Sequence, residues 1–324
     1  MKRLIKRLIF FLAYYTGVDA LFFWLNRRAK RIVVFHNVIP DELAEGLPEE
    51  IVGLKFSQFK AIVRECSRHF RFSIDVFDAK TLTITFDDGY RNQYSTAFRY
   101  LREQGIPAIL FFSPGTREVL TIDKMVFWRG LVPREKVPGG DIGRFWCNEF
   151  WPRFLSDGAT RGRATLAWLE EIFPLEPLMA KLPKPFLVER LGSISDAELD
   201  EMRSAGWQIG WHTKTHTPLS SLTEAELRDE LDAPPAFRNV VMAYPYGTDI
   251  CVNEIARCQT EKFGFPCASS YANASPNNGS LYFMPRLPSI GTDRYLIKAQ
   301  LSGLSYFMSY QRLLPKIGCR QGEK

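Results

Sequence analysis

Short apolar runs that alternate with amphipathic segments constrain the fold of this 324-residue chain more than any other feature. The runs at residues 31–37, 81–86 and 106–115 are rich in β-branched and aromatic residues, and they predict strands. The segment between the last two, residues 91–104, has helical spacing. Strand, helix, strand order is typical of a parallel sheet with crossover helices, so the sequence predicts the α/β class.

The same order of elements returns after residue 190. Two predicted helices begin with capping boxes, Ser195 with Glu198 and Thr223 with Glu226. The runs WQIGWH and VVMAYPYG predict strands, and a last strand is expected near Arg286. Residues 116–190 interrupt the order and are rich in Trp, Pro and Arg. They predict either a lid over a site or a helical insertion with its own small core.

The N-terminal segment has a composition that leaves three readings open. Residues 8–25 are long enough to span a bilayer but carry Gly17 and Asp19 near their middle. They predict a helix that lies on a membrane or packs on the domain, a membrane anchor, or a cleaved signal peptide.

The charge and the cysteines bear on partners and location. Much of the net charge of +6 lies on either side of this apolar segment, within residues 1–31, which favours a membrane surface over nucleic acid. The six cysteines form no CxxC pair and lean toward a reducing compartment. A membrane-associated or cytoplasmic location is therefore expected rather than secretion.

Two adjacent carboxylates, Asp87 and Asp88, end the predicted strand at residues 81–86 and precede Gly89. Neighbouring side chains on a strand point in different directions, so the two carboxylates cannot share one task. Their repulsion calls for a nearby cation, and a metal ion is the obvious candidate. A surface turn built on Asp-Gly is the alternative.

Two of the four histidines, His212 and His216, follow the predicted strand WQIGWH at a spacing of four residues. On a helical turn, residues four apart lie on one face and can reach one metal ion. The carboxyl ends of parallel strands converge, so these imidazoles and the carboxylates at residues 87–88 are expected together. Two imidazoles and one carboxylate form a catalytic type of metal site and leave the second carboxylate free to act as a base.

The segments ITFDDGY, HTKTH and AYPYG, in this order and with these spacings, resemble the first three motifs of the polysaccharide deacetylases, the NodB-type carbohydrate esterases. The resemblance covers residues 31–303. It implies a distorted (β/α) barrel with fewer than eight regular strands, a divalent metal ion that is usually zinc, and hydrolysis of N-acetyl groups on amino-sugar polymers. The expected organisation begins with an N-terminal hydrophobic and basic helix at residues 1–30. The barrel follows in two parts, residues 31–115 and 191–303, on either side of an insertion or lid at residues 116–190. A tail at residues 304–324 ends the chain.

Carried over position by position, the resemblance implies a role for each motif residue. Asp88, His212 and His216 would bind the metal ion, and Asp87 would act as the general base. The backbone N–H of Tyr246 would help to hold the oxyanion.

The chain departs from the family pattern at three places. The arginine of the third motif is replaced by Ala243, and Arg286 is the candidate to take its place beside Asp87, the alternative being a surface salt bridge. No histidine follows His216, so the family's late histidine is missing. His36, in a stretch that resembles the poly-N-acetylglucosamine deacetylase branch, is expected to act as general acid, with a buried structural histidine as the alternative. The fourth motif has no convincing match.

Three functions are consistent with these residues. The first is metal-dependent deacetylation of a bacterial exopolysaccharide. The second is deformylation or deacetylation of a lipid-linked sugar at the membrane, and the third is glycan binding by a catalytically inactive barrel.

Overall fold

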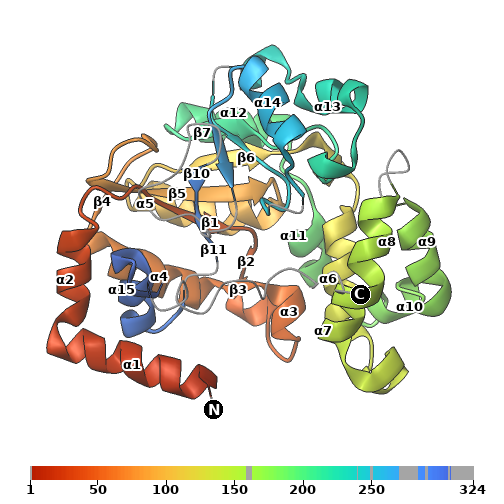
Figure 1. Cartoon of the computed structure of the whole chain (residues 1–324), viewed down its shortest axis with the longest axis horizontal. Coiled ribbons are helices and arrows are strands. Elements are labelled where there is room, and N and C mark those ends of the chain that lie inside the picture. Colours follow the sequence, from red (N-terminus) through yellow and green to blue (C-terminus); the bar gives the residue numbers. More distant parts are fainter. Residues whose placement is uncertain are drawn as a thin grey trace, which may run out of the picture.

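The computed structural model describes residues 2–157, 163–238, 240–248, 251–269, 284–288, 291–305 and 307 of the chain. A sheet of short strands lies at the centre, and helices surround it (Figure 1). Nine strands pair in the order β10-β9-β8-β7-β6-β5-β1-β11, with β4 beside β5, and all these pairs are parallel. The strands are β1 Arg31–Phe35, β4 Arg71–Phe72, β5 Thr81–Asp88, β6 Ile109–Phe112, β7 Gln208–Trp211, β8 Met242–Ala243, β9 Cys267–Ser269, β10 Met284–Pro285 and β11 Leu287–Pro288.

The sheet is curled, because one short segment pairs with both ends of its path. Strands β10 and β11 are separated in the chain by Arg286 alone. Residues 284–288 therefore pair with β9 on one side and with β1 on the other. This arrangement, with its mostly helical insertion, confirms the predicted α/β class and distorted (β/α) barrel. A separate two-stranded sheet joins β2 Val38–Ile39 to β3 Leu54–Lys55.

The strand register brings the polar residues of three strands to one end of the barrel. Phe35 lies opposite Phe86, so His36 and Asp87 follow at the same level of neighbouring strands. Asp88 of β5 lies opposite Phe112 of β6, and Phe112 lies opposite Trp211 of β7. His212 follows Trp211 directly and is therefore at the same level. The functional side chains thus gather where the carboxyl ends of β1, β5 and β7 meet.

Helices cover the outside of the barrel. Helices α12 and α13 begin with the predicted capping boxes, in which Ser195 and Thr223 each accept a hydrogen bond from the backbone of the third helical residue. The helices around the barrel are α1 Lys2–Thr16, α2 Val18–Leu25, α3 Glu49–Val52, α4 Phe56–Ser67, α5 Arg99–Glu103, α12 Asp196–Ser204, α13 Glu224–Leu231, α14 Glu254–Lys262 and α15 Arg294–Ser302. A π-helix, Gln93–Phe98, precedes α5.

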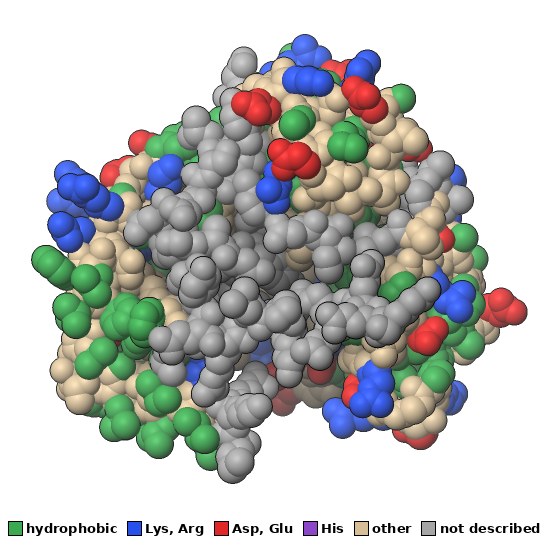
Figure 2. All heavy atoms as spheres, viewed as in Figure 1, with side chains coloured by type: hydrophobic (Ala, Val, Ile, Leu, Met, Phe, Trp, Pro, Cys, Tyr) green, Lys and Arg blue, Asp and Glu red, His purple; other side chains and the backbone are tan. Residues whose placement is uncertain are grey.

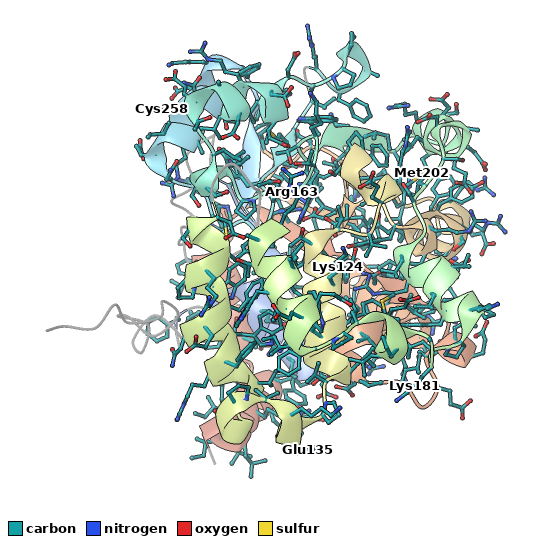
Figure 3. The ribbon with its side chains drawn as sticks, turned by 90° about the vertical axis from the view of Figure 1, so that its right-hand side faces the viewer. Lys124, Glu135, Arg163, Lys181, Met202 and Cys258 are labelled. Atoms are coloured by element: carbon teal, nitrogen blue, oxygen red, sulfur yellow. The ribbon has the colours of Figure 1, made fainter. Side chains whose placement is uncertain are left out.

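The insertion forms a separate group of helices at the right of Figure 1. Its helices are α6 Thr121–Leu131, α7 Ile142–Phe145, α8 Trp151–Ser156, α9 Arg163–Ile172, α10 Glu176–Met179 and α11 Lys184–Leu191. They are seen face-on in Figure 3, where Lys124 and Arg163 label α6 and α9. These helices share an apolar core in which Phe127, Trp128 and Phe150 are fully buried.

A buried ion pair within the insertion is hydrogen-bonded to the barrel through Tyr90. Nη1 of Arg190 lies 2.7 Å from Oδ1 of Asp123, and the hydroxyl of Tyr90 donates to the same oxygen at 2.8 Å. Tyr90 follows Gly89 at the carboxyl end of β5. The helices of the insertion are therefore fixed directly behind the strand end that carries the two aspartates.

Candidate metal centre and active site

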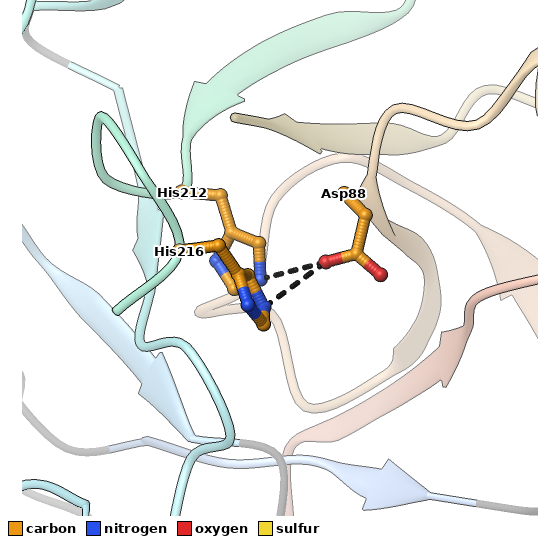
Figure 4. Close-up of side chains that lie close together, drawn as sticks. All are labelled: Asp88, His212 and His216. Carbon is orange, nitrogen blue, oxygen red and sulfur yellow. Dashed lines mark ion pairs between the residues drawn. The ribbon is translucent and has the colours of Figure 1, made fainter. Parts of the chain in front are cut away.

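Asp88, His212 and His216 converge at the carboxyl ends of β5 and β7 (Figure 4). Oδ1 of Asp88 lies 3.4 Å from Nε2 of His212 and 3.2 Å from Nε2 of His216. All three side chains are buried, and one ligand atom from each lies within 4.8 Å of the others. The structure thus brings together the three residues that the sequence analysis named as metal ligands.

The three side chains fit a divalent metal ion. Oδ1 of Asp88 is buried and makes no hydrogen bond of normal geometry within the described part of the chain. Nδ1 of His212 lies 2.8 Å from the carbonyl oxygen of Ala243, which can only accept, so Nδ1 carries the proton and the Nε2 lone pair faces Asp88. Ligands about 2.1 Å from a tetrahedral ion lie about 3.4 Å apart, which matches the observed spacing.

The electrostatics of this group also call for a cation. Burial disfavours the carboxylate of Asp88, but His216 and His212 outweigh burial and hold its pKa well below the ordinary value. Burial lowers the pKa of His212, but Asp87 and Asp88 raise it above the ordinary value. The buried carboxylates of Asp87 and Asp88 therefore favour a positive charge beside them, carried either by protonated histidine or by a metal ion.

The prediction that His212 and His216 lie on a helical turn is wrong. Residues 212–217 form an irregular loop after β7 Gln208–Trp211. Thr213 and His216 have φ angles of 63° and 57°, in the left-handed region that residues other than glycine seldom adopt. The loop turns the chain so that both imidazoles face Asp88. The two histidines are thus close together because of left-handed backbone, and not because they lie on one helical turn.

Asp88 and Gly89 end β5 with two consecutive left-handed residues. Their φ angles are 81° and 97°. A Cβ atom on Gly89 would lie 2.4 Å from the ring of Phe112, so the strand end packs too closely on β6 for any side chain at this position. Strained backbone at Asp88, Thr213 and His216 is concentrated at the candidate site, as is common where side chains must be held in a functional arrangement.

Asp87 forms a two-point ion pair with Arg286. Nη1 and Nη2 of Arg286 lie 2.7 Å and 2.6 Å from the two carboxylate oxygens of Asp87, and both side chains are fully buried. Arg286 also donates to the hydroxyl of Thr85, and Phe111 packs beneath the guanidinium. The alternative of a surface salt bridge is excluded by this burial.

The surroundings of Asp87 favour its ionised form. Burial opposes ionisation, but the Arg286 guanidinium together with His212 and His36 outweighs burial and lowers the pKa of Asp87. Oδ2 of Asp87 lies 3.9 Å from Nε2 of His212. This carboxylate therefore lies beside the candidate metal group and is available as a proton acceptor.

His36 follows β1 Arg31–Phe35 and lies close to Asp87. Nε2 of His36 is 3.8 Å from Oδ2 of Asp87, and 49% of the side chain is exposed. The alternative of a buried structural histidine is excluded by this exposure. The imidazole can exchange protons with solvent and with a molecule bound beside Asp87.

Tyr246 lies next to the metal group and contacts the insertion. Its φ is 60°, and its ring centre lies 5.0 Å from that of His216. Trp151 and Phe154 of α8 pack on the other side of the Tyr246 ring, with centres 5.9 Å and 6.3 Å away. The third motif therefore links the candidate site to the insertion.

Two residues of the site were missed by the sequence analysis. Thr85, which accepts from Arg286, lies two residues before Asp87 and on the same face of β5, so the two-residue period of a strand could have found it. The side-chain amide of Gln93 donates to the backbone oxygens of His36 and Asp87 and ties together the ends of β1 and β5. No local pattern marks Gln93, because its role depends on how the π-helix lies on the barrel.

Residues 75–126 match the family model described as polysaccharide deacetylase. The chain is a parallel barrel whose strand ends hold one carboxylate with two imidazoles, beside a second carboxylate, and this group is a candidate metal site. The matched segment carries the aspartate pair and confirms the expected resemblance there. Over this segment, which is less than a fifth of the chain, the protein is similar to the polysaccharide deacetylases.

The chain also resembles several solved deacetylase structures, each distantly. One is the Streptococcus pyogenes deacetylase PplD in complex with acetate, at 14% identity and a TM-score of 0.49, over 83% of this chain and 96% of that one. A de-N-acetylase from Aggregatibacter actinomycetemcomitans matches at 13% identity and a TM-score of 0.47, over 79% and 93% of the two chains. IcaB from Ammonifex degensii matches at 15% identity and a TM-score of 0.43, over 85% and 97%. No curated protein matches this chain significantly.

Proposed function

We propose that this chain is a divalent-metal-dependent hydrolase that removes N-acetyl groups from the amino sugars of a bacterial polysaccharide. One observation carries the proposal: a buried group of three metal-type ligands lies beside an ionised aspartate that is paired with a buried arginine. The match to the polysaccharide deacetylase model supports the choice of substrate class. Zinc is our proposed ion, because two imidazoles and one carboxylate form a donor set that suits it.

In the proposed mechanism each residue has a separate task. Asp88, His212 and His216 would hold the ion, which when bound supplies a Lewis acid that makes water a better nucleophile near neutral pH. Asp87, kept ionised by Arg286, would accept the proton of the attacking water. The substrate acetyl group would lie beside Asp87 and the three ligand side chains, near the exposed imidazole of His36.

Two further groups complete the proposed reaction. The backbone N–H of Tyr246 would donate a hydrogen bond to the acetyl oxygen as negative charge develops on it. His36, which is exposed and close to Asp87, would donate a proton to the departing amine nitrogen. Amines are poor leaving groups, so this proton is needed for the carbon–nitrogen bond to break.

Assay of the released acid tests the proposal directly. Purified protein, stripped of metal and then supplied with zinc, cobalt or nickel, is expected to release acetate from an N-acetylglucosamine oligomer only when metal is present. Release of formate from a formylated, lipid-linked amino sugar, without acetate from the oligomer, would favour the second candidate substrate. Sugar binding with metal bound and no acid released from either substrate would support a glycan-binding barrel and contradict the proposal.

The role of His36 predicts a substrate-dependent defect. His36→Gln should slow release of acetate from the oligomer by about 100-fold, the lower range for loss of an acid catalyst. It should hardly affect hydrolysis of para-nitrophenyl acetate, because that leaving group departs without a proton. His69→Gln, a change at a histidine that follows α4 and contacts Glu65 and Phe23, is the matched control and should alter neither rate. Equal losses on both substrates would rule out an acid role for His36.

A further inference from the structure

Helix α1 Lys2–Thr16 exposes apolar side chains on the face that points away from the domain. Spacing of four, three and four residues places four of them on one side of the helix. Their exposed fractions lie between 42% and 73%: Leu4, Leu8, Phe11 and Tyr15. Phe10 and Ala13 lie on the opposite side and are buried against Ala299 and Leu304. Both faces of α1 are therefore apolar, but only one is buried; on the other face Phe11 contacts the ring of Tyr295, and Leu4, Leu8 and Tyr15 are more than half exposed.

Helix α2 Val18–Leu25 has the reverse of the usual amphipathic pattern. Its acidic residue, Asp19, is buried, and Nζ of Lys298 lies 2.9 Å from its carboxylate. Leu21, Trp24 and Leu25 are between 53% and 60% exposed. A helix on the surface of a water-soluble domain normally directs its charge outward and its leucines inward. The polarity of α2 suits an apolar environment outside the protein.

The two helices are held against the domain and do not form a continuous rod. Asn26, after α2, donates to the backbone oxygen of Ser302, and Arg7 of α1 pairs with Asp293. Within the described residues no single helix meets the length and hydropathy required to cross a membrane; α1 and α2 meet them only as a pair bent by 85°. Because of this bend and these contacts, both helices lie along the surface of the domain.

Positive charge lies next to the apolar surface. Arg27 and Arg28 follow α2 and are exposed, and the Arg27 guanidinium stacks 4.9 Å from the ring centre of Trp24. Figure 2 shows hydrophobic side chains gathered over α1 and α2 at the lower left, with a group of Lys and Arg side chains above them. Trp beside Arg is typical of the boundary between acyl chains and head groups.

We propose that α1 and α2 dock the domain on an anionic membrane surface, with their apolar side chains among the acyl chains and Arg27 and Arg28 at the phosphates. The exposed leucines account for insertion, and the arginines account for a preference for negative lipids. The pair thus anchors the protein to one leaflet without spanning the bilayer. This inference does not depend on the proposed catalytic function.

Sedimentation with vesicles tests the docking surface. The full chain is expected to bind vesicles of phosphatidylcholine with phosphatidylglycerol, to bind phosphatidylcholine vesicles less, and to lose binding as salt is raised. The double variant Leu8→Glu, Leu21→Glu should bind the anionic vesicles at least about tenfold more weakly, because each carboxylate would enter the apolar layer.

A matched control separates docking from a general effect of added charge. The double variant Val188→Glu, Ile255→Glu adds the same charge at positions that are 56% and 59% exposed on α11 and α14, and it should bind as the unchanged chain does. Unchanged circular dichroism and an unchanged denaturant unfolding midpoint would show that each variant is folded. Equal binding by both double variants, or no binding by the unchanged chain, would overturn the proposal. A dimer that the Leu8 and Leu21 changes dissociate, without vesicle binding, would also overturn it by assigning the surface to a second copy.

Discussion

Asp87→Asn is expected to leave metal binding intact and to lower kcat/KM for deacetylation by about 10²–10⁴-fold, the range for loss of a general base. The asparagine can still accept a hydrogen bond from Arg286 through its one amide oxygen, but it cannot take a proton from water. Asp88→Asn should instead weaken metal binding by more than about 100-fold, because it removes the charge of a direct ligand. Calorimetric titration of the metal-free proteins with zinc, together with acetate release, measures both effects.

The two asparagine variants serve as controls for each other. They remove one carboxylate charge each from adjacent residues at the end of the same strand, so a general disturbance of β5 would affect both measurements alike. Equal loss of metal affinity in the two variants would contradict the separate roles of ligand and base. Full activity of Asp87→Asn would show that the base lies elsewhere.

Arg286→Met should lower the free energy of unfolding of the metal-free protein by about 3–5 kcal/mol, the usual cost of leaving one partner of a buried ion pair without the other. Both side chains are at most 1% exposed, so water cannot replace the lost contacts. Chemical denaturation followed by circular dichroism measures the change. Arg228→Met, which removes an exposed pair with Glu224 on α13, is the matched control and should cost less than about 1 kcal/mol.

The same substitution should alter the dependence on pH. Arg286 lowers the pKa of Asp87 in the folded protein, so the pair stabilises the fold at pH values above the ordinary aspartate pKa. This stability is lost as the pH falls through the lowered pKa. In Arg286→Met, only His212 and His36 still oppose the effect of burial, so the pKa of Asp87 is higher than in the unchanged chain. The stability deficit should therefore shrink in acid, and the acid limb of the rate profile should move to higher pH. A deficit that is independent of pH would contradict the ion pair as its cause.

The repeated elements of the fold could be predicted from local pattern. Apolar, β-branched runs such as residues 81–86 can be recognised as buried strands from the sequence. The capping boxes at Ser195 and Thr223 can also be recognised, because each depends only on two residues that are three apart. The strands that close the barrel could not be defined in this way. Residues 284–285 and 287–288 are strands of two residues each, too short to show any period, and pairing with β9 and β1 alone defines them.

The site was less accessible to sequence reasoning, because its contacts join distant parts of the chain. Asp87 and Arg286 are 199 residues apart, and only the missing arginine of the third motif directed attention to Arg286. The spacing of His212 and His216 indicated their proximity for the wrong reason, since left-handed loop backbone rather than a helical turn brings them together. Gln93 shows no pattern, because three-dimensional packing alone gives its amide two backbone partners.

Anomalous diffraction from crystals soaked with zinc tests most directly whether Asp88, His212 and His216 hold a metal ion. The predicted result is one strong peak about 2.0–2.2 Å from a carboxylate oxygen of Asp88 and from Nε2 of both histidines, with Arg286 still paired to Asp87. A zinc ion ordered elsewhere, or no ion between these three side chains at saturating zinc, would contradict the assignment on which the proposed deacetylation depends.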